Sequence, residues 1–278
     1  SPSGRGAAAG GQCGGERVIV CKSSEELVRM RAANQIVADA LDELRAMVSP
    51  GVTTADLDAT VEARVREAGA TPAFKGYRGY PASLCASINH EVVHGIPSPR
   101  KLATGDIVSL DVGVLLEGYY GDSALTVAVG TVSSEAQELL RVTQEALEFG
   151  IAQTCVGARV SDIGHAIQCH VEAHGFSVVR EFVGHGIGTK LHEEPQVPNY
   201  GERGHGPRLA EGMVLAIEPM VNIGEPAVDV LDDGWTAVTR DGSLSAHFEH
   251  TVAVTSAGPD VLTRQLRDVP VSVSAQAS

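Results

Sequence analysis

Two histidines in a glycine-rich stretch are the first residues of this sequence that could do chemistry. They lie in residues 182–200, FVGHGIGTKLHEEPQVPNY, where Gly184 and Gly186 flank His185, and His192 follows. Glycine lets a backbone bend tightly or lie close to a ligand, and a histidine held there can present its ring to a metal ion or a substrate. The alternative is a glycine-rich turn with two solvated histidines.

Four carboxylates lie in apolar, strand-like runs of the sequence. Asp111 belongs to residues 107–115 and Asp122 to residues 119–129, and the later runs contain Glu218 and Glu249. The sequence indicates a turn near Glu117 and Gly118. If the chain turned instead at residues 116–117, Asp111 and Asp122 would face each other across a hairpin, with Cβ atoms about 5 Å apart. Two carboxylates at that distance repel each other, and a divalent cation removes the conflict.

Together with His185, the four acids form a ligand set of hard oxygens and one imidazole. Such a set suits two adjacent divalent ions, such as Co, Mn, Fe or Zn, better than one structural zinc. Two metals about 3.5–4 Å apart can bridge and activate a water molecule. The alternative for any single acid is a strand end or an ion pair, but basic residues are scarce near these positions.

Apolar periodicity, capping patterns and turn residues predict the elements that position these side chains. Ser23 with Glu26 begins a helix at residues 23–48, and Ser134 with Gln137 begins one at residues 134–153. Two further helices are predicted at residues 54–68 and 161–174. The predicted strands are residues 17–21, 83–88, 107–115, 119–129, 213–221, 235–239 and 244–255, with Asp-Gly turns at 233–234 and 241–242.

An internal repeat links the two halves of the chain. Residues 51–70 align with residues 157–176 without gaps, and each half then reaches an HGI tripeptide, at 94–96 and 185–187. Residues 102–111 also align with residues 209–218, which makes Asp111 the counterpart of Glu218. A duplicated helix–loop–strand unit would place its paired loops and acids around a pseudo-twofold axis.

Composition sets the class of protein. The 278 residues contain 21 Lys+Arg and 35 Asp+Glu, for a net charge of −14, which argues against a nucleic-acid partner. No apolar run approaches the ~18 residues of a membrane span, and the five cysteines form no CxxC pair, so we expect a cytoplasmic protein. We expect disordered or loose tails at residues 1–16 and 265–278, around one catalytic domain at 17–264.

Other candidate residues are set aside on their context. His170 and His174 have helical spacing but no acid at a HExxH-like position, which indicates a solvated face. Asp106 is a turn residue in this interpretation, and at least one of Glu193 and Glu194 is expected to be exposed.

Several motifs in order now resemble one family. The stretch 182–200, together with YRGYPASLCASIN, HGIP, LDVG, GDSALT, IEPM, GWTAVT and SLSAHFEHT, is similar to the blocks of type I methionine aminopeptidases over about residues 17–256. The resemblance implies the pita-bread fold, an α+β architecture of two pseudo-twofold-related halves with antiparallel sheet and outer helices. That fold agrees with the internal repeat.

The resemblance also implies a role for each site residue. Asp111 would be a two-oxygen ligand of one metal ion, Asp122 and Glu249 would bridge two ions, and His185 and Glu218 would complete the second site. Glu218 would also carry a proton for the attacking water, while His94 and His192 would contact the substrate amide. The implied methionine pocket consists of Tyr77, Tyr80, Cys85 and Trp235, with Phe74 and Leu191 at positions where this sequence varies from the bacterial form.

The implied activity is removal of the initiator methionine from nascent chains when the second residue is small. The enzyme would be a cytoplasmic monomer with the ribosome as a transient partner. Relatives of this fold that cleave Xaa-Pro peptides, or that have lost their metals and only bind, are the alternatives. Xaa-Pro enzymes carry an additional N-terminal domain, and a type II enzyme would carry a helical insertion between Glu218 and Glu249, an interval filled here by turns and strands.

Overall fold

The chain folds into four α-helices and a set of mainly antiparallel strands within residues 18–265, which a computed structural model describes. The predicted tail 1–16 lies outside the described residues, as does all of the predicted tail 265–278 except Gln265. The helices are α1 (Ser24–Met47), α2 (Thr54–Glu67), α3 (Ser134–Ala152) and α4 (Val160–Ala173), and a 3₁₀ turn, η1, spans Tyr77–Gly79.

The strands of the first half are β1 (Thr71–Pro72), β2 (Leu84–Ile88), β3 (Glu91–Val93), β4 (Ile107–Leu116) and β5 (Tyr119–Ala128). Those of the second half are β6 (Ser177–Val178), β7 (Gly184–Gly186), β8 (Glu193–Val197), β9 (Val214–Ile217), β10 (Met220–Asn222), β11 (Val228–Val230), β12 (Ala237–Thr239), β13 (Ser245–His247), β14 (His250–Thr255) and β15 (Gly258–Val261).

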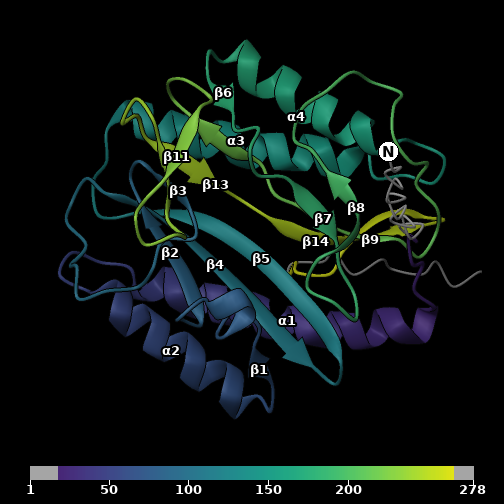
Figure 1. The fold of residues 1–278 in the computed structure, drawn as a ribbon, viewed down its shortest axis with the longest axis horizontal. Coiled ribbons are helices and arrows are strands. Elements are labelled where there is room, and N and C mark those ends of the chain that lie inside the picture. Colours follow the sequence, from purple (N-terminus) through teal and green to yellow (C-terminus); the bar gives the residue numbers. More distant parts are fainter. Residues whose placement is uncertain (1–17, 266–278) are drawn as a thin grey trace, which may run out of the picture.

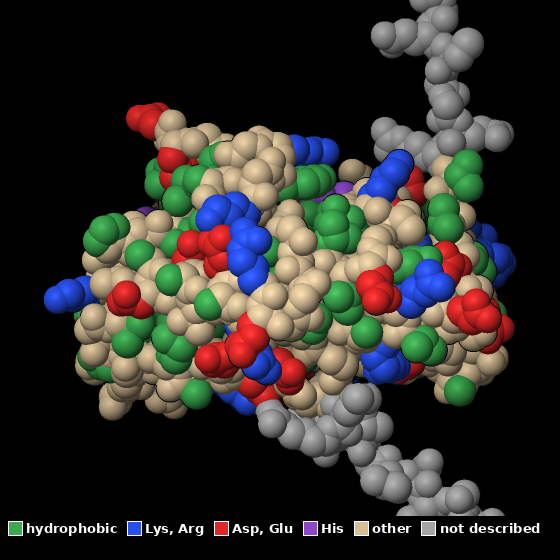
Figure 2. Space-filling view, turned by 90° about the horizontal axis from the view of Figure 1, so that it is seen from below, with side chains coloured by type: hydrophobic (Ala, Val, Ile, Leu, Met, Phe, Trp, Pro, Cys, Tyr) green, Lys and Arg blue, Asp and Glu red, His purple; other side chains and the backbone are tan. Residues whose placement is uncertain are grey.

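The helices form two pairs with the strands between them (Figure 1). Apolar residues of α1 and α2 pack with β2 and β4 in one core, and those of α3 and α4 pack with β9 and β14 in another. An isolated bridge between Ala124 of β5 and Glu249 connects the two halves. Figure 2 shows acidic and basic side chains interspersed over the face seen from below, which agrees with surface ion pairs such as that between Arg64 of α2 and Asp39 of α1.

The two halves repeat the same local structure, as the internal alignment predicts. Helix α2 and strand β1 correspond to α4 and β6 at the same spacing in the chain. Gly51 and Gly157 both have positive φ, at 95° and 88°, and their N–H groups donate to Leu102 and Leu209 carbonyls at 2.8 Å in each case. Identical backbone hydrogen bonds at aligned positions confirm the pseudo-twofold, α+β architecture.

The β4–β5 hairpin has a different register from the one that places the two acids opposite each other. The turn is Glu117–Gly118, with φ of 48° and 85°, so Leu116 pairs with Tyr119. Asp111 then opposes Ala124 and Asp122 opposes Gly113, and the prediction of direct opposition is wrong. Gly118 favours this turn because it tolerates positive φ, and the two acids still share one face of the hairpin as diagonal neighbours.

Four other predicted elements are corrected. Residues 18–22 form no strand, since Val18 and Val20 are exposed and the segment is tied instead by the Lys22 N–H to the Gly212 carbonyl at 2.6 Å. Helix α3 is capped by Ser133, whose hydroxyl accepts the Ala136 N–H, so Ser134 is the first helical residue. Adjacent serines make that one-residue shift invisible to a sequence pattern.

The run 213–221 is two strands, β9 and β10, separated by Glu218 and Pro219. Proline has no N–H to donate to a sheet ladder, which ends β9 at Ile217. The predicted strand 244–255 divides similarly into β13 and β14, with Phe248 and Glu249 between them. Both breaks therefore fall at a predicted metal ligand.

Candidate active site

The residues predicted for the site line one cavity of about 210 Å³. It lies between the two halves of the molecule and receives side chains from both. The predicted residues that line it are Phe74, Tyr77, Tyr80, Cys85, His94, Asp111, Asp122, His185, Leu191, His192, Glu218, Trp235 and Glu249.

Hydrogen bonds fix the backbone beneath the acids. Glu249 donates its N–H to the Ala124 carbonyl at 2.9 Å and accepts the Ser123 hydroxyl on its own carbonyl at 2.6 Å. The buried Asn199 side chain donates to the Glu218 carbonyl at 3.1 Å. These bonds hold the ends of broken strands, where a side chain can project into the cavity.

Strand β7 brings His185 into the site between β8 and β9, and its glycines permit that packing. A Cβ added at Gly184 would lie 2.3 Å from the Ala216 carbonyl oxygen, and one at Gly186 would lie 2.2 Å from the Glu194 carbonyl oxygen. Neither glycine has positive φ, so close approach of the neighbouring strands, rather than a tight bend, explains them.

The His185 ring is oriented with one nitrogen toward the acids. Its Nδ1 lies 2.9 Å from the Gly186 carbonyl oxygen, to which an Nδ1–H donates. Nε2 is then the free lone pair, and it lies 3.5 Å from Glu218 Oε1 and 4.0 Å from Asp122 Oδ2. A carbonyl that fixes the tautomer in this way is typical of a metal-ligating histidine. Ligand atoms of Asp122, His185 and Glu249 all lie within 4.8 Å of one another.

Burial disfavours the ionised form of the four acids, so a bound cation would stabilise their charged form. Burial raises the pKa of Asp111 to about 7. Burial and nearby carboxylates also raise the pKa values of Asp122, Glu218 and Glu249 well above their ordinary values. One buried oxygen each of Asp111, Asp122 and Glu249 has no hydrogen-bond partner among the described residues. Hard oxygens left unpaired beside an imidazole lone pair fit a divalent-metal site.

Two histidines flank the acids from opposite halves. His192 lies with its ring centroid 4.3 Å from that of His185, and its Nδ1 is 2.8 Å from the Tyr77 hydroxyl. His94 has a φ of 61° and contacts Phe182 edge-to-face, with ring centroids 5.3 Å apart. Burial lowers the pKa of His94 to about 4 and lowers that of His192, so both rings are neutral near pH 7.

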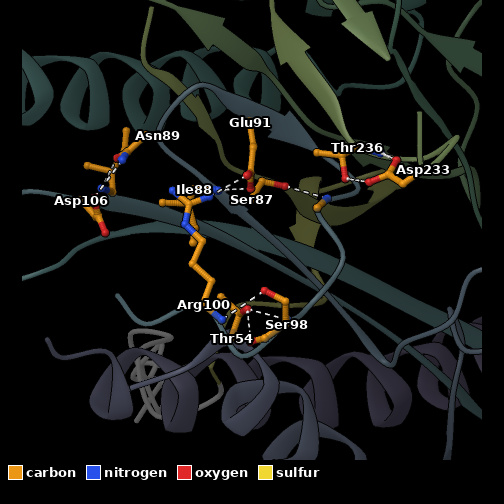
Figure 3. Close-up of polar contacts among 12 residues, drawn as sticks. Thr54, Ser87, Ile88, Asn89, Glu91, Ser98, Arg100, Asp106, Asp233 and Thr236 are labelled. Carbon is orange, nitrogen blue, oxygen red and sulfur yellow. Dashed lines mark hydrogen bonds and ion pairs between the residues drawn. The ribbon is translucent and has the colours of Figure 1, made fainter. Parts of the chain in front are cut away.

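Polar contacts hold the segment that carries His94. Figure 3 shows Glu91 accepting from the Ile88 N–H at 2.7 Å and from Arg100 at 2.9 Å, while the Asn89 side chain donates to Asp106. Gly95 then lies against β2, where an added Cβ would be 2.3 Å from the Ala86 carbonyl oxygen. These contacts hold the segment on both sides of His94, whose backbone has a left-handed conformation.

The remaining cavity wall is aromatic and apolar. Tyr80 and Trp235 meet edge-to-face with ring centroids 5.1 Å apart, and the Tyr80 hydroxyl donates to the Gly95 carbonyl. Asp233 accepts the backbone N–H of Trp235 and the hydroxyl of Thr236, which holds the turn at residues 233–236. Figure 3 shows the contact between Asp233 and Thr236. Burial, reinforced by the charge of Asp111, raises the pKa of the Cys85 thiol well above its ordinary value, so Cys85 is a neutral wall group.

Some cavity residues were missed by sequence reasoning. His247 lines the cavity with its side chain 2% exposed, and its Nε2 lies 4.0 Å from Glu218 Oε2 without a hydrogen-bond partner among the described residues. It belongs to the block SLSAHFEHT, two residues before Glu249, so alternation along a strand could have identified it. Arg78, Val93, Phe182, Val183 and Met220 also line the cavity.

The residues set aside lie outside this cavity. His170 pairs with Glu145 at 3.1 Å and its ring packs on Phe149, so it is partly buried rather than fully solvated. Asp106 accepts the Ala103 N–H in a turn, as predicted. The expectation of an exposed Glu193 or Glu194 is wrong, because both are partly buried and Glu193 pairs with Lys22.

Comparison with known proteins decides the family. Residues 28–256 match metallopeptidase family M24. This chain belongs to that family. It is 53% identical over 246 residues to a methionine aminopeptidase of Clostridium perfringens, covering 88% of this chain and 99% of the relative. The resemblance to methionine aminopeptidases is confirmed, and with it the prediction of an enzyme of the metallopeptidase class.

Solved structures agree on the fold of this M24 chain. A methionine aminopeptidase from Rickettsia prowazekii superposes with a TM-score of 0.88 at 43% identity, over 89% of this chain and 100% of that one. A prolidase from Pyrococcus furiosus superposes with a TM-score of 0.72 at 24% identity, over 90% of this chain and 66% of the prolidase, and shares the fold alone. Within residues 18–265, no helix combines the length and the apolar character needed to cross a membrane.

Proposed function

We propose that this M24 enzyme removes the N-terminal methionine from newly made polypeptides whose second residue is small, using two divalent ions. The observation that carries the proposal is the convergence on one cavity of the five-ligand set, two neutral histidines and an apolar wall. The ions could be Co, Mn, Fe or Zn, since each accepts mixed oxygen and imidazole ligands. Action on nascent chains would place the enzyme in the cytoplasm as a monomer that meets the ribosome transiently.

Asp111, Asp122, His185, Glu218 and Glu249 would hold the ions. When bound, the ions supply Lewis acidity and lower the pKa of a water molecule. The raised pKa of Glu218 suits it to accept a proton from that water and to deliver it to the departing amine.

The two flanking histidines would act on the substrate's first peptide group. If the Tyr77 hydroxyl donates to Nδ1 of His192, Nε2 keeps its hydrogen and can donate to a carbonyl oxygen that gains negative charge. His94 is also neutral, and it would contact the same peptide group from the other side of the cavity. Donors fixed before the reaction stabilise the tetrahedral intermediate without reorganisation.

The aromatic wall would select the side chain. Met is unbranched and polarizable, and its sulfur packs well at the edges of rings such as Tyr80 and Trp235. Cys85, buried and neutral, would close the end of the wall without charge. Leu191, 3% exposed, and Phe74, 9% exposed, would complete it.

Peptide turnover tests the proposal. After reconstitution with Mn, Co or Fe, we expect hydrolysis of Met-Ala-Ser, little of Leu-Ala-Ser, and none of Xaa-Pro peptides whose first residue is not Met. Glu218→Gln should reduce kcat by at least about 100-fold, the lower end of a general acid–base contribution. Full activity of Glu218→Gln would contradict the mechanism, and preference for Xaa-Pro peptides would contradict the substrate.

A further inference from the structure

A buried ion pair joins the N-terminal segment 18–22 to the loop that carries His192. Lys22 Nζ lies 2.5 Å from Glu193 Oε2, and the two side chains are only 3% and 9% exposed. Burying two charges is costly, and such a pair is weak evidence for stability by itself. Its partners lie 171 positions apart in the chain, so it fixes two segments that no local structure connects.

The Glu193 carboxylate also organises the loop around the histidine. Its second oxygen, Oε1, accepts the Lys190 N–H at 3.1 Å and the Thr189 hydroxyl at 3.4 Å. One carboxylate therefore closes residues 189–193, with Leu191 and His192 between its contacts. Both of those residues face the cavity.

Lys22 packs against the backbone of the same loop. A Cβ added at Gly188 would lie 2.4 Å from Lys22 Cε and 2.7 Å from Glu193 Oε1. Lys22 is fixed in turn, since its Nζ donates to the Val20 carbonyl at 3.0 Å and its backbone N–H to the Gly212 carbonyl at 2.6 Å. Gly188 is a glycine because this lysine occupies the space of its side chain.

From this geometry we infer that Lys22 is a positioning residue for His192, acting through Glu193. The lysine touches no part of the cavity. It holds the loop so that the His192 ring lies against His185 and Tyr77. The inference rests on the proposed function only for its effect on turnover, because the position of the ring is measurable without any reaction.

A double-mutant cycle on the metal-loaded full chain tests the coupling. Lys22→Met should lower kcat/KM for Met-Ala-Ser by about 10–100-fold, the loss expected from a displacement near 1 Å. In a His192→Ala background the same substitution should lower kcat/KM by less than about twofold, because the ring through which Lys22 affects the reaction is absent. Lys22→Arg, which keeps the charge, should restore most of the activity. Equal losses in both backgrounds would overturn the inference.

Two controls separate positioning from folding. Arg31→Met removes an ion pair between α1 and β15 with the same change in charge, and should leave kcat/KM within about twofold. If Lys22→Met does not fold, Glu193→Gln, which keeps an acceptor for the Lys190 N–H, should show the same dependence on His192.

NMR of the metal-free protein with labelled histidines decides the inference independently of turnover. Lys22→Met should shift or broaden the His192 ring resonances and leave those of His250, which is held by Thr263, unchanged. Unchanged His192 resonances would overturn the positioning role. If the wild-type enzyme cleaved none of the peptides, the proposed function would fail while this comparison still tested Lys22.

Discussion

At the residue scale, burial shifts the pKa values of the four acids and of His185 toward their neutral forms. The acids are pushed toward their neutral form, and His185 is pushed toward its neutral form with a pKa of about 3. Desolvation always disfavours the charged form, so in the same environment the pKa values of acids rise and those of histidines fall. The four acids and His185 then offer many lone pairs and no positive charge of their own. A divalent ion would supply that charge and accept the lone pairs.

Proton release should accompany metal binding. Asp111, with a pKa of about 7, must lose its proton before it can bind an ion, and the other three acids have raised pKa values as well. We expect the affinity for Mn²⁺ to be at least about tenfold higher at pH 8 than at pH 6. Calorimetry in buffers of different ionisation enthalpy measures the protons released. Asp111→Asn is the control, and it should release fewer protons.

His247 should affect the reaction although sequence reasoning passed over it. Its Nε2 faces Glu218 across 4.0 Å and lacks a partner among the described residues, so it can hydrogen-bond to Glu218 or to a bound substrate. We expect His247→Phe, which fills the space without a polar atom, to lower kcat/KM by about tenfold. His247→Gln keeps a donor and should lose less. Equal activities of the two variants would contradict a polar role.

At the element scale, β7 positions His185, the proposed nitrogen ligand, because the neighbouring strands can approach β7 closely. Its two flanking glycines meet carbonyl oxygens of β9 and of residue 194 on both sides. A side chain at either position would push the strands apart, and His185 would move with them. The two glycines are therefore needed for the packing of the strands as well as for the position of His185.

Gly186→Ala should reduce stability and metal affinity together. The added methyl group must displace the Glu194 carbonyl, at a cost of about 1–3 kcal/mol in the free energy of unfolding. Denaturant unfolding and Mn²⁺ titration measure the two effects. Gly69→Ala is a matched control, since its φ of 74° strains alanine by about 1–2 kcal/mol but leaves β7 untouched. Loss of stability without loss of affinity in Gly186→Ala would contradict the link.

At the scale of the whole molecule, the site joins two similar halves. Asp111 lies on β4 and Glu218 directly follows the equivalent strand β9, and the bridge at Ala124 and Glu249 brings the second half against the first. Neither half contains the whole ligand set. Metal binding should therefore stabilise the entire domain rather than one part of it.

Thermal unfolding should report this effect with a defined pH dependence. Folding raises the pKa of Asp111 to about 7, so its contribution to the stability of the metal-free protein is present at low pH and is lost as pH rises through about 7. Asp122, Glu218 and Glu249 also have raised pKa values and act in the same direction. The buried histidines act oppositely, because their lowered pKa values stabilise the fold above about 6.5 and that stability is lost as pH falls toward 3–4.

An added ion takes the place of the protons on the acids. At 100 times its Kd we expect Mn²⁺ to raise Tm by roughly 5–10 °C at pH 8. The rise should be smaller at pH 6, where protons compete with the ion. Calorimetric scans with Mn²⁺ and with EDTA at both values of pH measure it, and a larger rise at pH 6 would contradict the assigned ligands.

Local patterns in the sequence determined the helices and the repeat, and they indicated which residues form the proposed ligand set. Capping boxes such as that of Ser23 and Glu26, and glycines such as Gly51 and Gly157, act over a few residues, so their outcome is readable in the chain. Motif resemblance supplied the roles of the site residues. The predicted strand 213–221 ran across the break between β9 and β10, although Pro219 marks it in the sequence, since proline cannot continue a ladder.

Tertiary structure decided what depends on segments far apart in the chain. The burial of His247 and the Lys22–Glu193 pair arise only when remote segments pack, because burial and pairing are properties of the surroundings and not of the residue type. The sequence therefore specified the chemistry of the site, and packing specified the geometry and charge state in which that chemistry is held.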